Sequence, residues 1–175
     1  ETDFILEPTF MVVYDWCEDV VNAKPIIYAD IETKGHLSNR DQNQITVIGM
    51  CRGDTGQVLV IPVHDRDGYY WDINEWPNIM RLVQMVLTSC GCVFHNAEFD
   101  VKHLNYQGFG PVKIAGDTML AHHALHPELP HDLGYVASVH GQVPYWKGTL
   151  KNAKKQDDLE PLKFREYNAY DCLVL

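Results

Sequence analysis

Two acidic residues, Asp30 and Glu32, follow a short apolar run in the segment Pro25-Ile-Ile-Tyr-Ala-Asp-Ile-Glu-Thr33. In a strand, side chains two residues apart point to the same face, so these carboxylates would lie side by side, with Ile31 on the opposite face. Adjacent carboxylates repel each other and are costly to bury without a counter-charge. A divalent cation such as Mg²⁺ or Mn²⁺ relieves that cost, because it prefers oxygen ligands. For this pair alone, a solvated strand end is the alternative interpretation.

Three more residues suited to the same chemistry lie near the ends of other expected elements. Asp100 is one turn into a helix that we expect to begin at Asn96, just after a short buried strand. Tyr167 and Asp171 are four residues apart in a helical pattern, which places them on one face. Together with the first pair, they make four acids and one tyrosine that the fold could bring together.

The elements that must position these residues follow from apolar periodicity and from glycine and proline positions. We expect strands over residues 26–32, 44–51, 57–63 and 92–94 and a shorter one over 112–114, with a hairpin turn at 52–56. We expect helices over 10–23, 77–90, 117–125, 131–140 and 159–175, besides the one that begins at 96. We expect loops over 34–43, 64–76 and 141–158. This order predicts an α/β domain with a mixed sheet flanked by helices.

Composition bounds the class of protein. A chain of 175 residues that is 46% hydrophobic is expected to form one globular domain over residues 1–175, and it contains no apolar run of the ~20 residues that a membrane span needs. Five scattered cysteines without a C-x-x-C pair argue for a reducing compartment, with the cytoplasm as the simplest assignment and an organelle as the open alternative. The net charge of −10 argues against attraction of nucleic acid to the whole surface, although bound divalent ions would reverse the local field.

In order and spacing, the acids and the tyrosine resemble the three motifs of the DEDDy class of 3′–5′ exonucleases. The motifs read Asp30-Ile-Glu32-Thr33, Asn96-Ala-Glu-Phe99-Asp100 and Tyr167-Asn-Ala-Tyr-Asp171. The segments that begin at Asp117 and His131 are similar to the stretch between the second and third motifs in proofreading domains of family A, phage-like DNA polymerases. The resemblance implies a ribonuclease-H-like fold and hydrolysis of the terminal phosphodiester of DNA to nucleoside 5′-monophosphates.

The resemblance also implies two divalent metal ions, Mg²⁺ or Mn²⁺, as cofactors. Asp30 would bridge both ions, Glu32 and Asp171 would complete the site of the ion that activates water, and Asp100 would hold the second ion, largely through water. Tyr167 would orient the attacking water and help to deprotonate it. Two ions held by carboxylates fit phosphodiester hydrolysis, which needs a nucleophilic oxygen at neutral pH and a stabiliser for the departing 3′ oxygen.

Other residues have both a functional and a structural interpretation. Thr33, Asn96 and Phe99 resemble family positions near the terminal nucleotide, although Asn96 could be only an N-cap and Phe99 only a core residue. The basic run from Lys147 to Arg165 is either a solvated loop or a contact to substrate phosphates.

The histidines His122, His123 and His126 suggest zinc, because the first and last are one turn apart. No acid or cysteine completes the set at a familiar spacing, so surface or product-pocket histidines are favoured.

The expected partner is the single-stranded 3′ end of DNA, with RNA as an alternative, and a DNA polymerase module in a longer parent chain. The chain begins at Glu1 and ends at Leu175 within an apolar stretch, which fits a piece of a longer protein. One rival interpretation is a stand-alone exonuclease of the ribonuclease D or Werner type. The other is an inactive module that binds nucleic acid.

Overall fold

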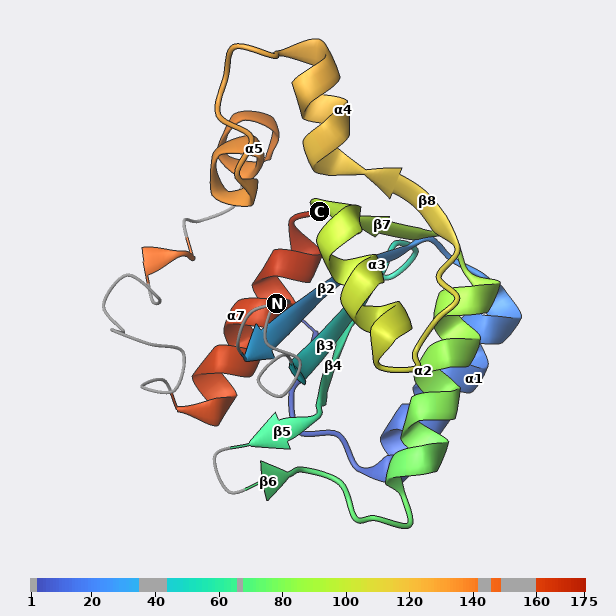
Figure 1. Ribbon diagram of the computed structural model, residues 1–175. Helices are drawn as coiled ribbons and strands as arrows, with labels where there is room; N and C mark the ends of the chain where they lie inside the picture. Colours follow the sequence, from blue (N-terminus) through green and yellow to red (C-terminus); the bar gives the residue numbers. More distant parts are fainter. Residues whose placement is uncertain (1–2, 35–43, 66–67, 142–145, 149–159) are drawn as a thin grey trace.

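A six-stranded mixed sheet forms the centre of the computed structural model, which describes residues 3–34, 44–65, 68–141, 146–148 and 160–175. Its strands lie in the order β1-β4-β3-β2-β7-β8 (Figure 1). Their bounds are Phe4–Ile5 (β1), Ile27–Lys34 (β2), Gln44–Arg52 (β3), Val58–Pro62 (β4), Cys92–Phe94 (β7) and Ile114–Asp117 (β8). Strand β3 runs antiparallel to both of its neighbours, β2 and β4. The other pairs, β1 with β4, β2 with β7 and β7 with β8, are parallel. The predicted fold class is therefore confirmed.

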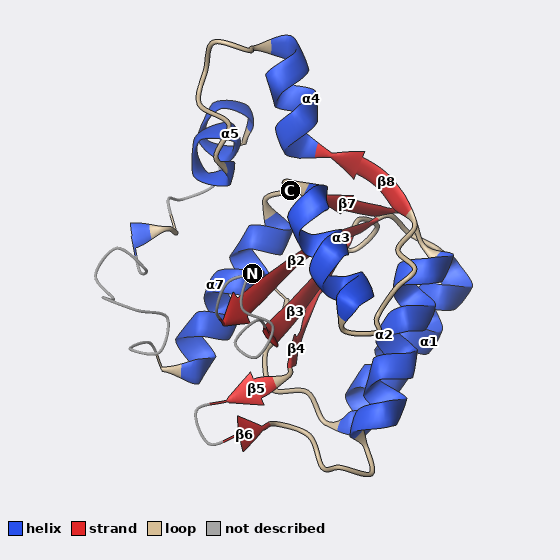
Figure 2. Cartoon of the chain, viewed as in Figure 1, coloured by secondary structure: helices blue, strands red, loops and turns tan. Residues whose placement is uncertain are grey.

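Helices cover both faces of this sheet (Figures 1 and 2). Their bounds are Phe10–Ala23 (α1), Trp76–Ser89 (α2), Ala97–Tyr106 (α3), Thr118–Leu125 (α4), Leu133–His140 (α5) and Pro161–Leu173 (α7). Apolar residues of α1, α2 and α3 form the larger core with one face, and α7 forms a smaller core with the other. Helices α4 and α5 extend beyond the end of the sheet. None of the described helices is long and apolar enough to cross a membrane.

The observed elements correct several expected boundaries. The segment expected to be a loop over 64–76 contains a small hairpin, with β5 at His64–Asp65 and β6 at Gly68–Tyr69. Strand β1 was not predicted, because two residues are too few to show a period. The short strand expected at 112–114 begins at Ile114, and the helix expected from 131 begins at Leu133. Residues 35–43, 142–145 and 149–158 of the expected loops lie outside the described residues.

Glycine at position 49 lets α7 lie close against the sheet. Gly49 is in β3, directly opposite Asp30 of β2. A Cβ atom at this position would lie 2.5 Å from Cys172 Sγ of α7 and even closer to Asn168 Oδ1. Both of these side chains are fully buried, so neither can move aside without repacking the helix. The absence of a side chain at Gly49 therefore determines how near α7 comes to the acids on β2.

We expect Gly49→Ala to lower the free energy of unfolding by about 1–3 kcal/mol, because the added methyl group overpacks the contact between β3 and α7. Urea denaturation of both proteins measures this change. Gly116→Ala is the matched control, because its added Cβ would lie at an ordinary 3.6 Å from Val93. An unchanged stability of Gly49→Ala would show that α7 does not depend on this close approach.

Candidate functional site

Strand β2 presents its two acids on the face that α7 covers. Ile27, Ala29 and Ile31 are buried in the core on the opposite face, as the alternation of a strand requires. Asp30 and Glu32 are therefore turned away from that core, and each is half-buried. The expected same-face arrangement of the two carboxylates is confirmed by this alternation.

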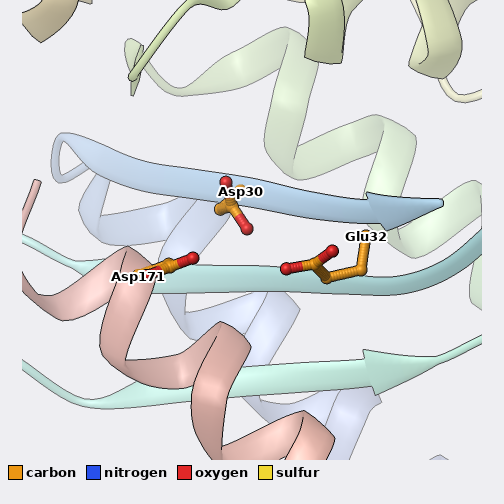
Figure 3. Close-up of side chains that lie close together, drawn as sticks. All are labelled: Asp30, Glu32 and Asp171. Carbon is orange, nitrogen blue, oxygen red and sulfur yellow. The ribbon is translucent and has the colours of Figure 1, made fainter. Parts of the chain in front are cut away.

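Helix α7 brings a third carboxylate to this pair. One carboxylate oxygen from each of Asp30, Glu32 and Asp171 lies within 4.8 Å of the others. Figure 3 shows the Asp30 and Glu32 side chains on β2 and the Asp171 side chain on α7 directed toward one another. Tyr167 lies one turn before Asp171, is buried, and forms a side-chain hydrogen bond with it. Residues more than 130 positions apart in the sequence thus form one acidic cluster.

Asn168, which the sequence did not single out, joins α7 to β2 at this cluster. Its side chain is fully buried, and its Nδ2 donates to Asp30 Oδ2 at 2.8 Å and to the Asp30 carbonyl oxygen at 3.3 Å. A buried amide donor of this kind orients an ionised carboxylate and partly offsets its desolvation. The only sequence signal was its place within the third motif, directly after Tyr167.

Two neighbouring residues from outside the predicted elements complete the surroundings of Asp171. Trp146 Nε1 donates a hydrogen bond to Asp171 Oδ1 at 2.6 Å, and the Lys147 ammonium lies 3.7 Å from the same oxygen. Lys147 Nζ is also 5.8 Å from the centre of the Tyr167 ring. Both residues come from a polar stretch without periodicity, so no pattern could place them here.

Asp100 lies next to this group but not within it. Its carboxylate is buried and accepts a hydrogen bond from the Ile31 backbone N–H at 3.1 Å. Ile31 lies between Asp30 and Glu32 in the sequence of β2. This hydrogen bond therefore holds the first turn of α3 against the part of β2 that carries the two acids. Asp100 also raises the pKa of Asp30, which shows that the two charges act on each other.

Asn96 occupies the expected N-cap position of α3, but its side chain does not do the capping. Asn96 adopts a left-handed conformation with φ of 73°, and its side chain makes no capping hydrogen bond. The Asp117 carboxylate takes that role instead, accepting from the backbone N–H groups of Asn96 at 3.2 Å and Ala97 at 2.8 Å. The same carboxylate also caps α4 through Met119 and Leu120. Asp117 thus anchors the helix that carries Asp100, and a sequence pattern cannot show a cap supplied from 20 residues away.

Burial and mutual repulsion raise the pKa values of these acids. The pKa of Asp30 is well above its usual range because of desolvation and the charges of Glu32, Asp100 and Asp171. Burial raises the pKa of Asp100 to about 7, against the opposing hydrogen bond from Ile31. Burial also raises the pKa of Asp171, although Lys147, Trp146 and Tyr167 lower it in part. This accumulation of carboxylates is stabilised by added positive charge, and its all-oxygen donor set suits a hard divalent cation.

A cavity of about 430 Å³ opens beside the acids. Of the three residues expected near the terminal nucleotide, Asn96 is in the described lining of this cavity, and Thr33 and Phe99 are not. The lining residues are Asp30, His95, Asn96, Met119, His131, Asp132, Leu133, Lys147 and Asp171. Phe99 is 39% exposed and packs on the His103 ring, so the alternative of a core residue is wrong. The structure thus places Asn96 beside the acids and leaves Phe99 available at the surface of α3.

Of the expected surface or pocket histidines, His123 is exposed, whereas His122 is only 3% exposed and lines a separate cavity between α4 and α5. His131 and His95 line the cavity beside the acids, and His95 Nε2 is 2.7 Å from the His131 carbonyl oxygen. The side of the cavity toward α4 and α5 thus combines His131 with Met119, Asp132 and Leu133.

Comparison with known proteins identifies a family and a fold. A family model described as 3′–5′ exonuclease matches residues 12–175. No curated protein matches the chain. Among solved structures, a nuclease described as an apo form is 25% identical, with 89% of this chain and 70% of that chain covered and a TM-score of 0.62.

Two ribonuclease D structures share the fold at lower identity. Trypanosoma brucei RNase D, solved as a complex with GMP, is 16% identical with a TM-score of 0.71, and the match covers 98% of this chain and 54% of that one. Escherichia coli RNase D, described as an exoribonuclease involved in structured RNA processing, is 19% identical with a TM-score of 0.59, covering 99% and 42%. The chain thus spans about half the length of these proteins.

The raised pKa of Asp100 predicts a pH dependence of stability in the absence of divalent ions. An aspartate ordinarily titrates near 3.9, so between about pH 4 and pH 7 the folded protein holds a proton that the unfolded chain has released. Stability from this group is full below pH 4 and is lost as the pH rises through 7. Asp100→Asn cannot titrate, so we expect it to gain stability relative to the wild type as the pH rises from 5 to 8.

Thermal or urea unfolding of both proteins in EDTA measures this difference at each pH. Saturating Mg²⁺ is the control condition, because an ion that binds the ionised carboxylates offsets their repulsion and should abolish the trend. A difference between the two proteins that does not vary with pH would contradict the assigned environment of Asp100.

Proposed function

The chain belongs to the 3′–5′ exonuclease family, and on that premise we propose that it releases nucleoside 5′-monophosphates from the 3′ end of single-stranded DNA. The observation that supports this proposal is the meeting of Asp30, Glu32 and Asp171 within 4.8 Å, with Asp100 and Tyr167 beside them. Hydrolysis of a phosphodiester at neutral pH needs concentrated positive charge near the reacting phosphate. This acidic cluster is suited to holding that charge.

In this proposal, two divalent ions, Mg²⁺ or Mn²⁺, are the cofactors. Asp30, Glu32 and Asp171 would hold one ion, and Asp30 with Asp100 would hold the second. When bound, such ions lower the pKa of the attacking water and stabilise the charge of the departing 3′ oxygen. The hydrogen bonds from Asn168, Trp146 and the Ile31 N–H fix the carboxylates in place beforehand, so less reorganisation is needed when the ions bind.

Tyr167 acts in this scheme as a hydrogen-bonding group and not as a base. Burial and the nearby charges of Asp171, Glu32 and Asp30 raise its pKa above the ordinary value of 10. The phenol therefore stays protonated at neutral pH. Its hydroxyl, already hydrogen-bonded to Asp171, is placed to orient the water that attacks the phosphorus atom.

Lys147 is the residue that we propose to contact the substrate phosphate. Its ammonium lines the 430 Å³ cavity together with Asp30 and Asp171, and the lysine side chain is 25% exposed. A cation at the edge of an acidic site attracts the phosphate of the incoming strand, which the acids alone would repel. The cavity has the size range of sites that hold a nucleotide-sized ligand.

DNA is the proposed substrate because the three motifs and the segments at Asp117 and His131 resemble proofreading domains of DNA polymerases. A polymerase module in the same longer chain would then be the partner. RNA is the second candidate, favoured by the similarity to Trypanosoma brucei RNase D, which was solved with GMP and with the RNA U12. In that case the domain would act in a ribonuclease D-like exonuclease.

We expect Asp30→Ala to reduce 3′-end trimming by about 100-fold or more, because Asp30 would be lost from the sites of both ions. The measurement is gel analysis of a 5′-labelled single-stranded DNA oligonucleotide incubated with Mg²⁺. Circular dichroism shows whether the variant is folded. Glu98→Ala is the matched control, since Glu98 is an exposed acid two residues before Asp100 that pairs with Lys102.

The substrate is decided by the same assay with matched single-stranded RNA, single-stranded DNA and mispaired duplex DNA. Preferential trimming of the mispaired DNA strand supports proofreading, and preferential trimming of RNA supports the second candidate. Trimming by Asp30→Ala at the wild-type rate would overturn the assignment of the acids.

Lys147→Met should raise KM for the oligonucleotide by about 10-fold or more, because a charge-assisted contact to a phosphate contributes about 1.5–3 kcal/mol. Metal affinity should stay the same or increase, since the substitution removes a cation that lies 3.7 Å from Asp171. Steady-state kinetics and calorimetric titration with Mn²⁺ measure the two quantities separately. A loss of metal affinity with unchanged KM would show that Lys147 supports the acids and not the substrate.

A further inference from the structure

Helices α4 and α5 lie at one end of the molecule (Figure 1), and histidine rings contact one another between them. Five of the nine histidines occur between Thr118 and His140, at positions 122, 123, 126, 131 and 140. Within α4, all eight residues of which the structure describes, His122 is the one buried residue. A helix held only by packing would bury leucine here, yet Leu120 and Leu125 are 60% and 72% exposed.

Within the part of the chain that the structure describes, one nitrogen of His122 has no hydrogen-bonding partner. His122 Nδ1 lies 2.9 Å from His131 Nδ1, and His131 Nε2 lies 2.9 Å from His123 Nδ1. If His122 Nδ1–H donates to His131, then His122 Nε2 carries a bare lone pair. This Nε2 atom is buried and makes no hydrogen bond to any residue that the structure describes. A buried polar atom without a partner is costly, and a bound ligand would remove that cost.

Two further imidazole rings surround His122 at distances typical of a shared ion. The ring centres of His126 and His140 are each 5.4 Å from that of His122 and 6.3 Å from each other. Three imidazoles bound to a tetrahedral Zn²⁺ with Zn–N bonds of 2.0–2.1 Å have their ring centres about 5 Å apart. The three rings therefore already have nearly the separations that a common ion would impose.

We propose that His122, His126 and His140 form a binding site for a transition-metal ion of the Zn²⁺ type, with water as the fourth ligand. His126 directly follows the last residue of α4, and its backbone N–H donates to the His122 carbonyl oxygen at 2.8 Å, which holds the two residues one turn apart. His140 from α5 supplies a third imidazole. The 2.9 Å contact between His122 Nδ1 and His131 Nδ1, with the proton on His122, would be the outer contact that orients a metal-binding imidazole.

Closure of the site needs only rotation of side chains at the surface. Among the described residues, three potential ligand atoms lie within 4.8 Å of one another only in the acidic cluster. The nitrogens of His122, His126 and His140 do not meet this spacing, so at least one of the three rings must turn to bind a common ion. His140 is exposed and His126 partly exposed, and such rings rotate freely.

An ion at this position would join α4 to α5 beside the proposed active site. Both helices line a cavity of about 350 Å³ that Val174 and Leu175 close from the other side. Met119 of α4 and Leu133 of α5 also line the cavity that contains Asp30 and Asp171. The proposed site would thus act as a structural brace for one wall of the acidic site, separate from the ions of the acidic cluster.

The test is calorimetric titration with ZnCl₂ in an Asp30→Ala background, which weakens the acidic cluster as a competing site. We expect one Zn²⁺ to bind, a rise in the melting temperature on binding, and at least ~10-fold weaker affinity after His126→Ala or His140→Ala. Tetrahedral Co²⁺ should give a strong visible absorption spectrum that both substitutions remove. Thermal melting in EDTA verifies that each variant is folded. We expect His140→Ala to fold normally, because His140 is exposed.

His64→Ala is the control, because His64 lies on β5, away from α4 and α5 and from the contacts between His122, His131 and His123. It should bind Zn²⁺ as tightly as the parent protein. The proposal is overturned if the parent binds no Zn²⁺, or if His126→Ala and His140→Ala bind it as tightly as His64→Ala does. Neither result bears on the exonuclease proposal, because the readout is metal binding and not activity.

Discussion

Repulsion among closely spaced, partly buried carboxylates is the constraint on which this structure depends. Asp30, Glu32 and Asp171 meet within 4.8 Å, and Asp100 acts on them from the neighbouring helix. Without cations, this arrangement opposes folding, as the raised pKa values of these acids show. The surrounding protein must therefore hold the acids together by contacts that are independent of any ion.

Those contacts come from each element around the site. Gly49 lets α7 approach the sheet, and Asn168 uses that short distance to reach Asp30. Asp117 anchors α3 and, with it, the carboxylate of Asp100, while Trp146 holds Asp171 from the other side. These residues are not expected to react, yet they determine where the reacting groups lie. Such preorganisation is the main way in which a protein lowers the barrier of a reaction that develops charge.

The two largest apolar cores have different roles in positioning the acids. The larger core, with α1, α2 and α3, supplies most of the buried apolar surface and supports β2 from behind. The smaller core, with α7, positions Asp171 against the open face of the same strand. A third, smaller apolar cluster packs Leu133 and Ala137 of α5 against Trp146 and Tyr167, beside the acids. Helix α4 buries only His122 among its residues, so it has less apolar support than α5.

The sequence by itself determined the elements and the order of the acidic motifs. Alternation in β2 sufficed to place Asp30 and Glu32 on one face, and the spacing of Tyr167 and Asp171 sufficed to place them on one side of α7. Only the tertiary structure decided which residues hold these groups. Asn168, Trp146, Lys147 and Asp117 act across distances of about 20 to 140 residues along the chain. Periodicity reports which face a side chain occupies, whereas its partner depends on how separate elements pack.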